Sequence, residues 1–404
     1  MIPFAAGQPK STMDALGRRI RELDGIGIAQ LVTITKELPY LDEGAVEKVD
    51  FTTSYCGART RDHVNKGTGA FAPVFLKDFP RMYSTEYDPT VALVQVSPPD
   101  KHGYVSLGVA VDQNKASAEH AKVVIAEVNP QMPRCHGDCF LHVSQLTHIV
   151  EYDHPMLEIP RPVITDVERS IGEHVASLVR DGDCLQLGIG SIPDAAVLFL
   201  KDKKHLGIHT EMFSDSVVDL VESGAIDNSA KTLHKGKMVS AFLMGTRRLY
   251  DFVDDNPTVW MFPCDYTNDP FVISRNDNMV SVNSSVEVDL MGQAASDTIG
   301  PRQYSGVGGQ IDFIRGALAS RNGRAILALP STTGKNNEIS KIVPRLAAGT
   351  PVTTTRNDVD YVVTEYGVAS LRFKTLRQRA EQLINIAHPD FREELRAAMR
   401  KMNF

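Results

Sequence analysis

Short apolar runs alternate along the chain with amphipathic helical segments, and this alternation restricts the possible folds more than any other feature. The runs expected to form strands are residues 91–96, 121–128, 183–189, 237–244, 258–262, 324–330 and 359–364. Amphipathic segments, among them residues 193–202 and 215–224, lie between several of these runs. Strands that alternate with helices predict an α/β fold with largely parallel sheets, whose strands are covered on both faces.

The chain is long enough for two or three domains, since it has 404 residues of which 42% are hydrophobic. A weak internal repeat favours two units, because residues 4–16 and 188–200 both predict an apolar strand, a glycine turn, a proline and a helix. The proline-rich stretch at residues 153–166 separates these units. We therefore expect an N-terminal domain over residues 1–165 and a C-terminal domain over residues 166–404.

The charge pattern argues against nucleic acid and membrane surfaces as partners. The formal net charge is −7, from 43 basic and 50 acidic residues that mix along the chain without a long run of one sign. Apolar runs stay short of the ~20 residues that a membrane-spanning helix needs, and the N-terminus lacks the basic-then-apolar order of a signal peptide. We expect a protein of the cytoplasm.

Cysteine and histidine cluster once, at Cys135, His136, Cys139 and His142. Structural zinc sites usually combine two well-separated pairs of ligands, and the sequence offers no second cluster. We therefore expect no metal site and assign these residues a buried or turn role. The chain has five cysteines without a regular framework, which suits a reducing compartment.

Two glycine-rich turns precede predicted helices. The first contains Gly188, Ile189, Gly190, Ser191 and Ile192. Backbone N–H groups at such a turn can face a phosphate or an oxyanion. Pro193 stands where the dinucleotide-binding fingerprint needs its third glycine, so a Rossmann-type site is disfavoured. The second turn contains Gly306, Gly308 and Gly309, and exposed N–H groups there make a second oxyanion donor possible. For both turns the alternative is a tight turn without a ligand.

Three glutamates that follow or lie within predicted strands are candidate nucleophiles: Glu211, Glu287 and Glu365. Composition alone does not choose among them. Residues 281–293 alternate polar and apolar side chains, which favours one amphipathic strand with Glu287 on its solvated or hydrogen-bonded face. Glu211 precedes the helix predicted from residue 215, whose N-terminal dipole would favour an ionised carboxylate.

Eight motifs extend over nearly the whole chain: "SPPDKHGYVSLG", "EVNPQMPR", "GIGSIPDAA", "HTEMFSD", "NSSVEVDLMGQ", "GVGGQIDF", "RNDVDYVVTEYG" and "IAHPDFREEL". In this order they resemble the acetyl-CoA hydrolase/transferase family, especially its 4-hydroxybutyrate and butyryl-CoA:acetate CoA-transferases. The resemblance is specific for the family and weak for the substrate. It implies two similar open α/β domains with the active site in the cleft between them, and a homodimer.

The resemblance also implies roles for individual residues. Glu211, in the "HTEM" motif, would be the covalent carrier of CoA, which demotes Glu287 and Glu365. The turn at residues 188–192 would bind CoA and supply the N–H of Ile189 as an oxyanion donor. Family members usually carry an additional N-terminal helical segment, which we expect to lie outside the cleft.

Three further positions match residues of the family that contact the substrate. Gly309 matches the second oxyanion donor, while Val286 and Lys335 match positions that contact CoA. From its own sequence, Lys335 fits either a phosphate contact or a solvated loop. Acyl-CoA would thus be the substrate, without a metal or another cofactor.

Together these assignments predict a CoA-transferase that moves CoA between short carboxylic acids through a glutamyl-CoA thioester. The expected substrates are 4-hydroxybutyryl-CoA or butyryl-CoA with acetate, while succinate and itaconate stay open as alternative acyl groups. A covalent intermediate predicts ping-pong kinetics. Two alternatives stay open. Attack of water on the intermediate would make the chain an acyl-CoA hydrolase, and the glycine turns alone would also fit a noncatalytic CoA-binding module.

Overall fold

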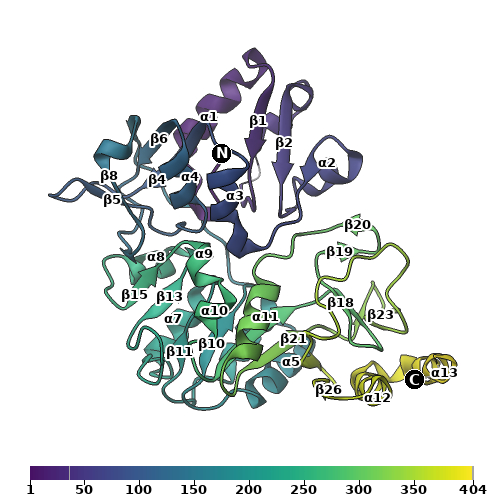
Figure 1. Cartoon of the computed structure of the whole chain (residues 1–404). Coiled ribbons are helices and arrows are strands. Elements are labelled where there is room, and N and C mark those ends of the chain that lie inside the picture. The colour runs from purple at the N-terminus through teal and green to yellow at the C-terminus, as the bar shows by residue number, and fades with distance from the viewer. Residues whose placement is uncertain (36, 403–404) are drawn as a thin grey trace.

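The structure is a computed structural model and describes residues 1–35 and 37–402. Its purple and blue N-terminal elements lie above the teal and green elements of the later chain in Figure 1. Helices alternate with strands, and most strand pairs are parallel, so the predicted α/β fold class is confirmed. None of the helices in the described residues is both long enough and apolar enough to span a membrane.

A six-stranded sheet forms the centre of the C-terminal half, in the order β11-β10-β16-β21-β25-β26. Its strands are β10 (Cys184–Leu187), β11 (Gly207–Ile208), β16 (Met279–Ser284), β21 (Arg324–Ala328), β25 (Tyr361–Thr364) and β26 (Gly367–Ser370). All neighbours pair in parallel except β26, which runs antiparallel to β25. The parallel strands therefore end along one edge, where ligands bind in open α/β sheets.

Two three-stranded parallel sheets form the N-terminal part. They consist of β1 (Ile26–Ala29), β2 (Val49–Thr53) and β3 (Ala70–Phe71), and of β4 (Val91–Val96), β6 (Val123–Val128) and β9 (His148–Glu151). The helices of this part are α1 (Lys10–Arg19), α2 (Arg61–Lys66), the 3-10 helix η5 (Leu76–Asp78), α3 (Phe79–Thr85) and α4 (Asn114–His120).

The helices of the later chain are α5 (Asp166–Ser177), α6 (Ser191–Leu198), α7 (Asp215–Glu222), α8 (Arg247–Val253), α9 (Cys264–Thr267), α10 (Pro270–Ile273), α11 (Gln310–Ala319), α12 (Leu376–Ile386) and α13 (Arg392–Lys401). Of these helices, α5, α11 and α12 contact the six-stranded sheet. Helix α11 packs through the fully buried Phe313, Ile314 and Ala317 into the core that contains Ala325 and Leu327 of β21. Helices α12 and α13 lie on the outside of the molecule (Figure 1), as their polar sequence predicted.

Small sheets connect the loops around this framework. Parallel pairs join β12 (Met212–Phe213) to β14 (Phe242–Leu243), and β15 (Val259–Met261) to both β13 (Met238–Ser240) and β7 (His136–Gly137). Strand β17 (Glu287–Asp289) lies between β18 (Ala294–Ala295) and β24 (Ile342–Val343). The antiparallel pairs are β5 (Tyr104–Ser106) with β8 (Phe140–His142), β19 (Thr298–Ile299) with β20 (Arg302–Gln303), and β22 (Thr332–Thr333) with β23 (Ile339–Ser340).

The region of the predicted domain boundary is extended but does not separate two independent cores. Residues 152–165 contain neither helix nor strand. Strand β7, which precedes them, pairs with β15, which follows them. One buried apolar cluster contains both Val94 of β4 and Leu185 of β10. The division at residue 165 therefore stays a prediction, and the packing is continuous across it.

The sequence prediction of a strand at the start of the chain is wrong. Residues Ala5–Gly7 form a short 3-10 helix, in which the Gly7 N–H donates to the Phe4 carbonyl at 2.9 Å. Gly7 lies so close to Ala110 that a Cβ atom on it would be 2.5 Å from the Ala110 Cβ. Tertiary packing against Ala110 thus overrides the local apolar pattern.

The prediction of one amphipathic strand over residues 281–293 is also wrong. Strand β16 ends at Ser284 and β17 begins at Glu287. The Ser285 hydroxyl bonds to the carbonyls of Glu287 and Ala295, at 3.2 and 3.0 Å, which stabilises the break. Asp289, on the polar face of the pattern, is fully buried and accepts hydrogen bonds within its own turn, so this face is hydrogen-bonded rather than solvated at Asp289.

Candidate active site

Glu211 lies between β11 and β12 at the carboxyl edge of the six-stranded sheet. Its carbonyl oxygen accepts the N–H groups of Ala241 and Phe242, at 2.9 and 3.0 Å. The hydroxyl of the preceding Thr210 bonds to the carbonyl of Leu187, the last residue of β10, at 3.2 Å. Because the backbone is held on both sides, the Glu211 side chain projects from a fixed position.

Two groups contact the half-buried Glu211 carboxylate. The side-chain amide of Asn268 donates to Oε2 at 2.9 Å, and the backbone N–H of Gly309 lies beside the carboxylate and favours its ionised form. Burial raises the pKa of Glu211 to about 7, and these two donors oppose the rise. Near neutral pH the carboxyl group is therefore present both ionised and protonated.

The helix N-terminus that faces Glu211 belongs to a different helix from the one expected. Helix α7 begins four positions later, at Asp215, whereas the donor Gly309 is the N-cap of α11. The N–H of Gly309 favours the ionised carboxylate, as expected for a helix N-terminus, but burial outweighs it and Asn268, so the pKa of Glu211 is raised.

The second glycine turn, which we call the closed turn (residues 306–309), is packed on several sides. A Cβ atom on Gly309 would lie 1.8 Å from Glu211 Oε2 and 2.2 Å from Asn268 Nδ2. A Cβ atom on Gly306 would lie 2.2 Å from the Ser54 carbonyl oxygen. Gly308 has φ of +56°, a conformation that favours glycine. Glycine is needed in this turn because Glu211, Asn268 and Ser54 approach its backbone closely.

The N-terminal part of the chain contributes residues around this turn. Burial and the nearby Glu211 raise the pKa of Tyr55 to about 12, so its phenol stays protonated. Arg61 of α2 donates to the Tyr304 carbonyl at 2.7 Å, and its guanidinium lies 3.7 Å from the centre of the Tyr304 ring. Leu76 donates its N–H to the Gly308 carbonyl at 3.3 Å. The site is therefore built from both parts of the chain.

The first glycine turn, which we call the open turn (residues 188–192), leads from β10 into α6. Gly190 is the N-cap of α6 with φ of +118°, and a Cβ atom on it would meet no atom of the described residues within 4 Å. The Ile189 side chain is 45% exposed. Ser191 donates its hydroxyl to Glu168, and Ile192 is buried. The turn thus presents its backbone at the surface.

Val286 and Lys335 lie in loops that follow strands of the same sheet. Val286 sits between β16 and β17 and donates its N–H to the Ala295 carbonyl at 2.9 Å. Lys335 is exposed in the loop between β22 and β23, which follows β21. The structure therefore brings Glu211 and Gly309 into contact, places the open turn and Val286 after the carboxyl ends of β10 and β16, and places Lys335 in a separate hairpin that follows β21.

The two other candidate glutamates have different surroundings. Glu365 accepts both the N–H and the hydroxyl of Ser331, at 2.9 and 2.6 Å, so both of its oxygens are engaged. Glu287 is half-buried, and burial together with the neighbouring Asp289 raises its pKa. Glu211 differs from both because a backbone donor of a glycine turn meets its carboxylate.

Two residues of the site were missed by the sequence reasoning. Asn268 is fully buried and follows α9, with no local pattern that marks it as a partner of Glu211. His209 is fully buried, its Nε2 lies 2.9 Å from the Thr267 carbonyl, and burial lowers its pKa to about 3. The neutral imidazole thus fixes the end of β11 beside Asn268, and a proton-transfer role near neutral pH is disfavoured.

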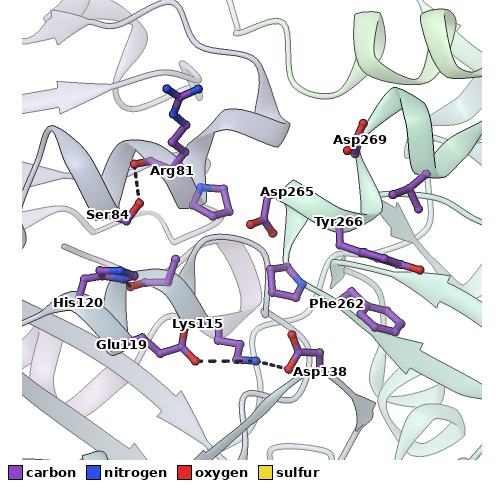
Figure 2. A pocket seen from close by; sticks show the side chains of 14 residues that line it. Arg81, Ser84, Lys115, Glu119, His120, Asp138, Phe262, Asp265, Tyr266 and Asp269 are labelled. Atoms are coloured by element: carbon purple, nitrogen blue, oxygen red, sulfur yellow. Dashed lines mark hydrogen bonds and ion pairs between the residues drawn. The ribbon is translucent and has the colours of Figure 1, made fainter.

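A separate cleft of about 680 Å³ lies between α3 and α4 on one side and α9 and α10 on the other (Figure 2). Asp265, Tyr266 and Asp269 line it, whereas the intervening Asn268 hydrogen-bonds Glu211. The residues that line this cleft include none of the site residues predicted from the sequence. The chemistry described above therefore lies outside this cleft.

Comparison with known families and proteins gives consistent matches. The acetyl-CoA hydrolase/transferase N-terminal domain matches residues 2–160, and the corresponding C-terminal domain matches residues 245–399. The 4-hydroxybutyrate coenzyme A transferase of Clostridium kluyveri is 54% identical over 402 residues, covering 99% of this chain and 93% of that protein. The butyryl-CoA:acetate CoA-transferase of Anaerostipes caccae is 38% identical, covering 96% of this chain and 89% of that protein.

The solved structures add a three-dimensional match. The crystal structure of 4-hydroxybutyrate CoA-transferase from Porphyromonas gingivalis superposes with a TM-score of 0.85 at 43% identity. That match covers 99% of this chain and 92% of the other. Sequence and structure are thus similar to the same kind of protein over almost the full length.

Proposed function

Because this chain belongs to the acetyl-CoA hydrolase/transferase family and is an acyl-CoA:carboxylate CoA-transferase, we propose that Glu211 carries CoA as a glutamyl thioester during transfer. We further propose 4-hydroxybutyryl-CoA or butyryl-CoA, with acetate as the second partner, as the substrates. The names of the relatives support these acyl groups.

One observation carries the assignment of Glu211. The amide of Asn268 donates to its carboxylate, and the backbone of Gly309 lies against it, with an N–H that favours the ionised form. A structural carboxylate can also accept such bonds, as Glu365 does from Ser331. Glu365 also lies at the carboxyl edge of the sheet, so Glu211 is distinguished by its place beside a turn where only glycine fits.

The transfer proceeds through two acyl substitutions at each half-reaction. The Glu211 carboxylate attacks the thioester carbonyl, the carbon–sulfur bond breaks, and an acyl-glutamyl anhydride and CoA thiolate form. The thiolate then attacks the Glu211 carbonyl carbon of the anhydride and releases the first carboxylate. A second carboxylate repeats these steps in reverse, attacking the glutamyl-CoA thioester and leaving as the new acyl-CoA.

The two proposed oxyanion donors serve different carbonyl groups in this scheme. Gly309 lies beside the oxygen atoms of Glu211 itself, so its N–H stabilises the tetrahedral oxyanion formed on the glutamyl carbon. The N–H of Ile189, in the open turn, is proposed to stabilise the oxyanion formed on the acyl group of the substrate. Asn268 holds the attacking carboxylate in one orientation.

The remaining predicted residues bind CoA in this proposal. The open turn has room for a ligand to approach its backbone closely, and Lys335 offers a positive charge to a phosphate. Val286, at the same carboxyl edge, contacts another part of CoA. We also propose that the enzyme needs no metal or further cofactor and that it acts as a homodimer in the cytoplasm.

The thioester can be tested by intact-protein mass measurement after incubation with a panel of short acyl-CoAs. We expect a CoA-sized adduct with the best donor, and its loss after mild borohydride treatment, which reduces the glutamyl thioester to an alcohol. Peptide mapping should place the reduced residue at Glu211, and Glu211→Gln should give neither adduct nor transfer.

Glu365→Gln is the matched control, because Glu365 also follows a strand of the sheet but has both oxygens engaged by Ser331. It should still form the adduct. Modification of Glu287 or Glu365 instead of Glu211 would identify that residue as the nucleophile. Thioester breakdown by water as fast as by acetate would favour a hydrolase, and absence of any adduct with an active Glu211→Gln variant would contradict covalent catalysis.

A further inference from the structure

The peptide between Gly308 and Gly309 connects the active site to the N-terminal part of the chain. Its C=O and N–H groups belong to one planar trans peptide and point in opposite directions. Gly309 lies against the Glu211 carboxylate, and its N–H favours the ionised form, whereas the C=O of Gly308 accepts the N–H of Leu76 at 3.3 Å. The orientation of the donor to Glu211 thus depends on the position of Leu76.

The neighbouring peptide, between Leu76 and Lys77, is held on both edges by buried side chains of the C-terminal half. The Cys264 thiol donates to the Leu76 carbonyl at 3.0 Å. The Lys77 N–H donates to Oδ2 of Asp312 at 3.2 Å. Cys264 and Asp312 are 0% and 2% exposed, so water does not compete for these contacts.

Asp312 closes this set of contacts into a ring. It lies in the first turn of α11, three positions after Gly309, the N-cap of the same helix. Asp312 accepts a hydrogen bond from Lys77, and the preceding residue, Leu76, donates one to Gly308. The chain from Gly308 to Asp312 then completes the ring. Glycine leaves the rotation of the Gly308–Gly309 peptide free, so an external constraint is needed to aim its N–H.

We propose that Asp312 is a positioning residue for CoA transfer, which holds the peptide between Leu76 and Lys77 so that Leu76 orients the Gly308–Gly309 peptide toward Glu211. This inference rests on the proposed function, because it concerns the donor to the proposed nucleophile. Asp312 acts through backbone groups and does not itself touch the reacting atoms.

The charge state of Asp312 fits this role. Burial, together with the nearby Glu211, raises the pKa of Asp312 to about 8, while the Lys77 N–H opposes the rise. Near neutral pH the carboxyl group is mostly uncharged and accepts the N–H without adding a second negative charge beside Glu211. An asparagine offers the same acceptor without a charge, so it should replace Asp312 in function.

The test compares Asp312→Ala and Asp312→Asn by steady-state kinetics of the full chain. Loss of the acceptor should lower kcat by about 10- to 100-fold, because a displaced donor no longer meets the developing oxyanion. KM for acyl-CoA should stay close to its original value, since CoA binds elsewhere along the sheet edge. Asp312→Asn should retain most of the kcat.

Asp360→Ala is the matched control for the loss of a buried carboxyl group. Asp360 is 5% exposed and accepts the Ala325 N–H at 3.2 Å, and burial raises its pKa as well. It precedes β25 and so lies at the opposite end of the strands from Glu211. Asp360→Ala should lower the unfolding temperature but leave kcat unchanged below it. Equal kcat in folded Asp312→Ala and Asp360→Ala would overturn the proposal, as would equal losses in Asp312→Ala and Asp312→Asn.

A second pair of variants decides the question if Asp312→Ala does not fold. Cys264→Ser retains a donor to the Leu76 carbonyl, whereas Cys264→Ala removes it. We expect a several-fold lower kcat for Cys264→Ala and a smaller loss for Cys264→Ser. Equal activity of both with the unchanged chain would overturn the proposal. Glu211→Gln, measured alongside, separates failure of the proposed function from failure of the role of Asp312. An active Glu211→Gln variant refutes the proposed function. If Glu211→Gln is inactive and Asp312→Ala keeps its full kcat, only the role of Asp312 is refuted.

Discussion

The two glycine turns at the carboxyl edge of the sheet have similar sequences but opposite environments. In the open turn, a Cβ atom on Gly188 would meet its nearest neighbour, Pro193 Cγ, at 3.9 Å. In the closed turn, a Cβ atom on Gly309 would lie 1.8 Å from Glu211 Oε2. Both turns lead into helices, yet one leaves space for a ligand and the other is filled by side chains of the protein.

A glycine-rich turn therefore has two distinct uses beside an active site. In the open turn the absent side chain lets an external molecule approach the backbone. In the closed turn it lets the carboxylate of Glu211 and the amide of Asn268 approach. The first use should affect substrate binding, and the second should affect the rate of chemistry.

The largest effect is expected for Gly309→Ala. The new methyl group cannot coexist with Glu211 Oε2 and Asn268 Nδ2, so the donor peptide or the carboxylate must move. We expect kcat to fall by about 10²- to 10³-fold, the range for loss of one oxyanion donor. Steady-state kinetics with butyryl-CoA and acetate measure this. A kcat within a few-fold of the original would mean that the close approach is not needed for transfer.

The pH dependence of the first half-reaction should reveal the raised pKa of Glu211. Ionised Glu211 is the nucleophile and its pKa is raised to about 7, so the rate should increase with pH and level off above that value. The expected increase is about tenfold between pH 6 and pH 8. Asn268→Ala removes a donor that favours the ionised form, so it should move this limb to higher pH. Rapid-mixing measurement of adduct formation gives the profile, and a flat profile down to pH 5 would contradict a raised pKa.

Gly188→Ala tests whether the open turn affects substrate binding rather than the chemical step. The methyl group fits the free protein, because the nearest atom is 3.9 Å away. It should therefore leave kcat and the unfolding temperature unchanged and raise KM for acyl-CoA several-fold by crowding the ligand. Kinetics and thermal unfolding of the same preparation test both points. A reduced kcat with unchanged KM would indicate that this turn, too, acts on the chemical step.

The smallest effect is expected for Lys335→Ala. The side chain is exposed, so its attraction to a phosphate is screened by solvent and salt. KM for acyl-CoA should rise by about threefold at low ionic strength, and the difference should shrink as salt is added. Lys235→Ala provides a control for removal of a lysine charge elsewhere on the surface. An effect that does not depend on salt would argue against a phosphate contact.

The alternation of apolar runs and helical segments determined the fold class, because the requirement to cover both faces of parallel strands is visible in local sequence. The predicted run at residues 91–96 coincides with β4, and the predicted helix at residues 215–224 contains α7. The motifs likewise identified the family, and with it the proposed role of Glu211. These features need only neighbouring residues to be recognised.

The tertiary structure decided which of three glutamates lies against a glycine turn and which groups surround each of them. Asn268 lies 57 positions from Glu211, and Ser331, which engages Glu365, lies 34 positions from that residue. The contacts of Leu76 with Gly308 and of Lys77 with Asp312 join opposite halves of the chain. Such contacts depend on how rigid elements pack against one another, and no local pattern of side chains specifies that arrangement.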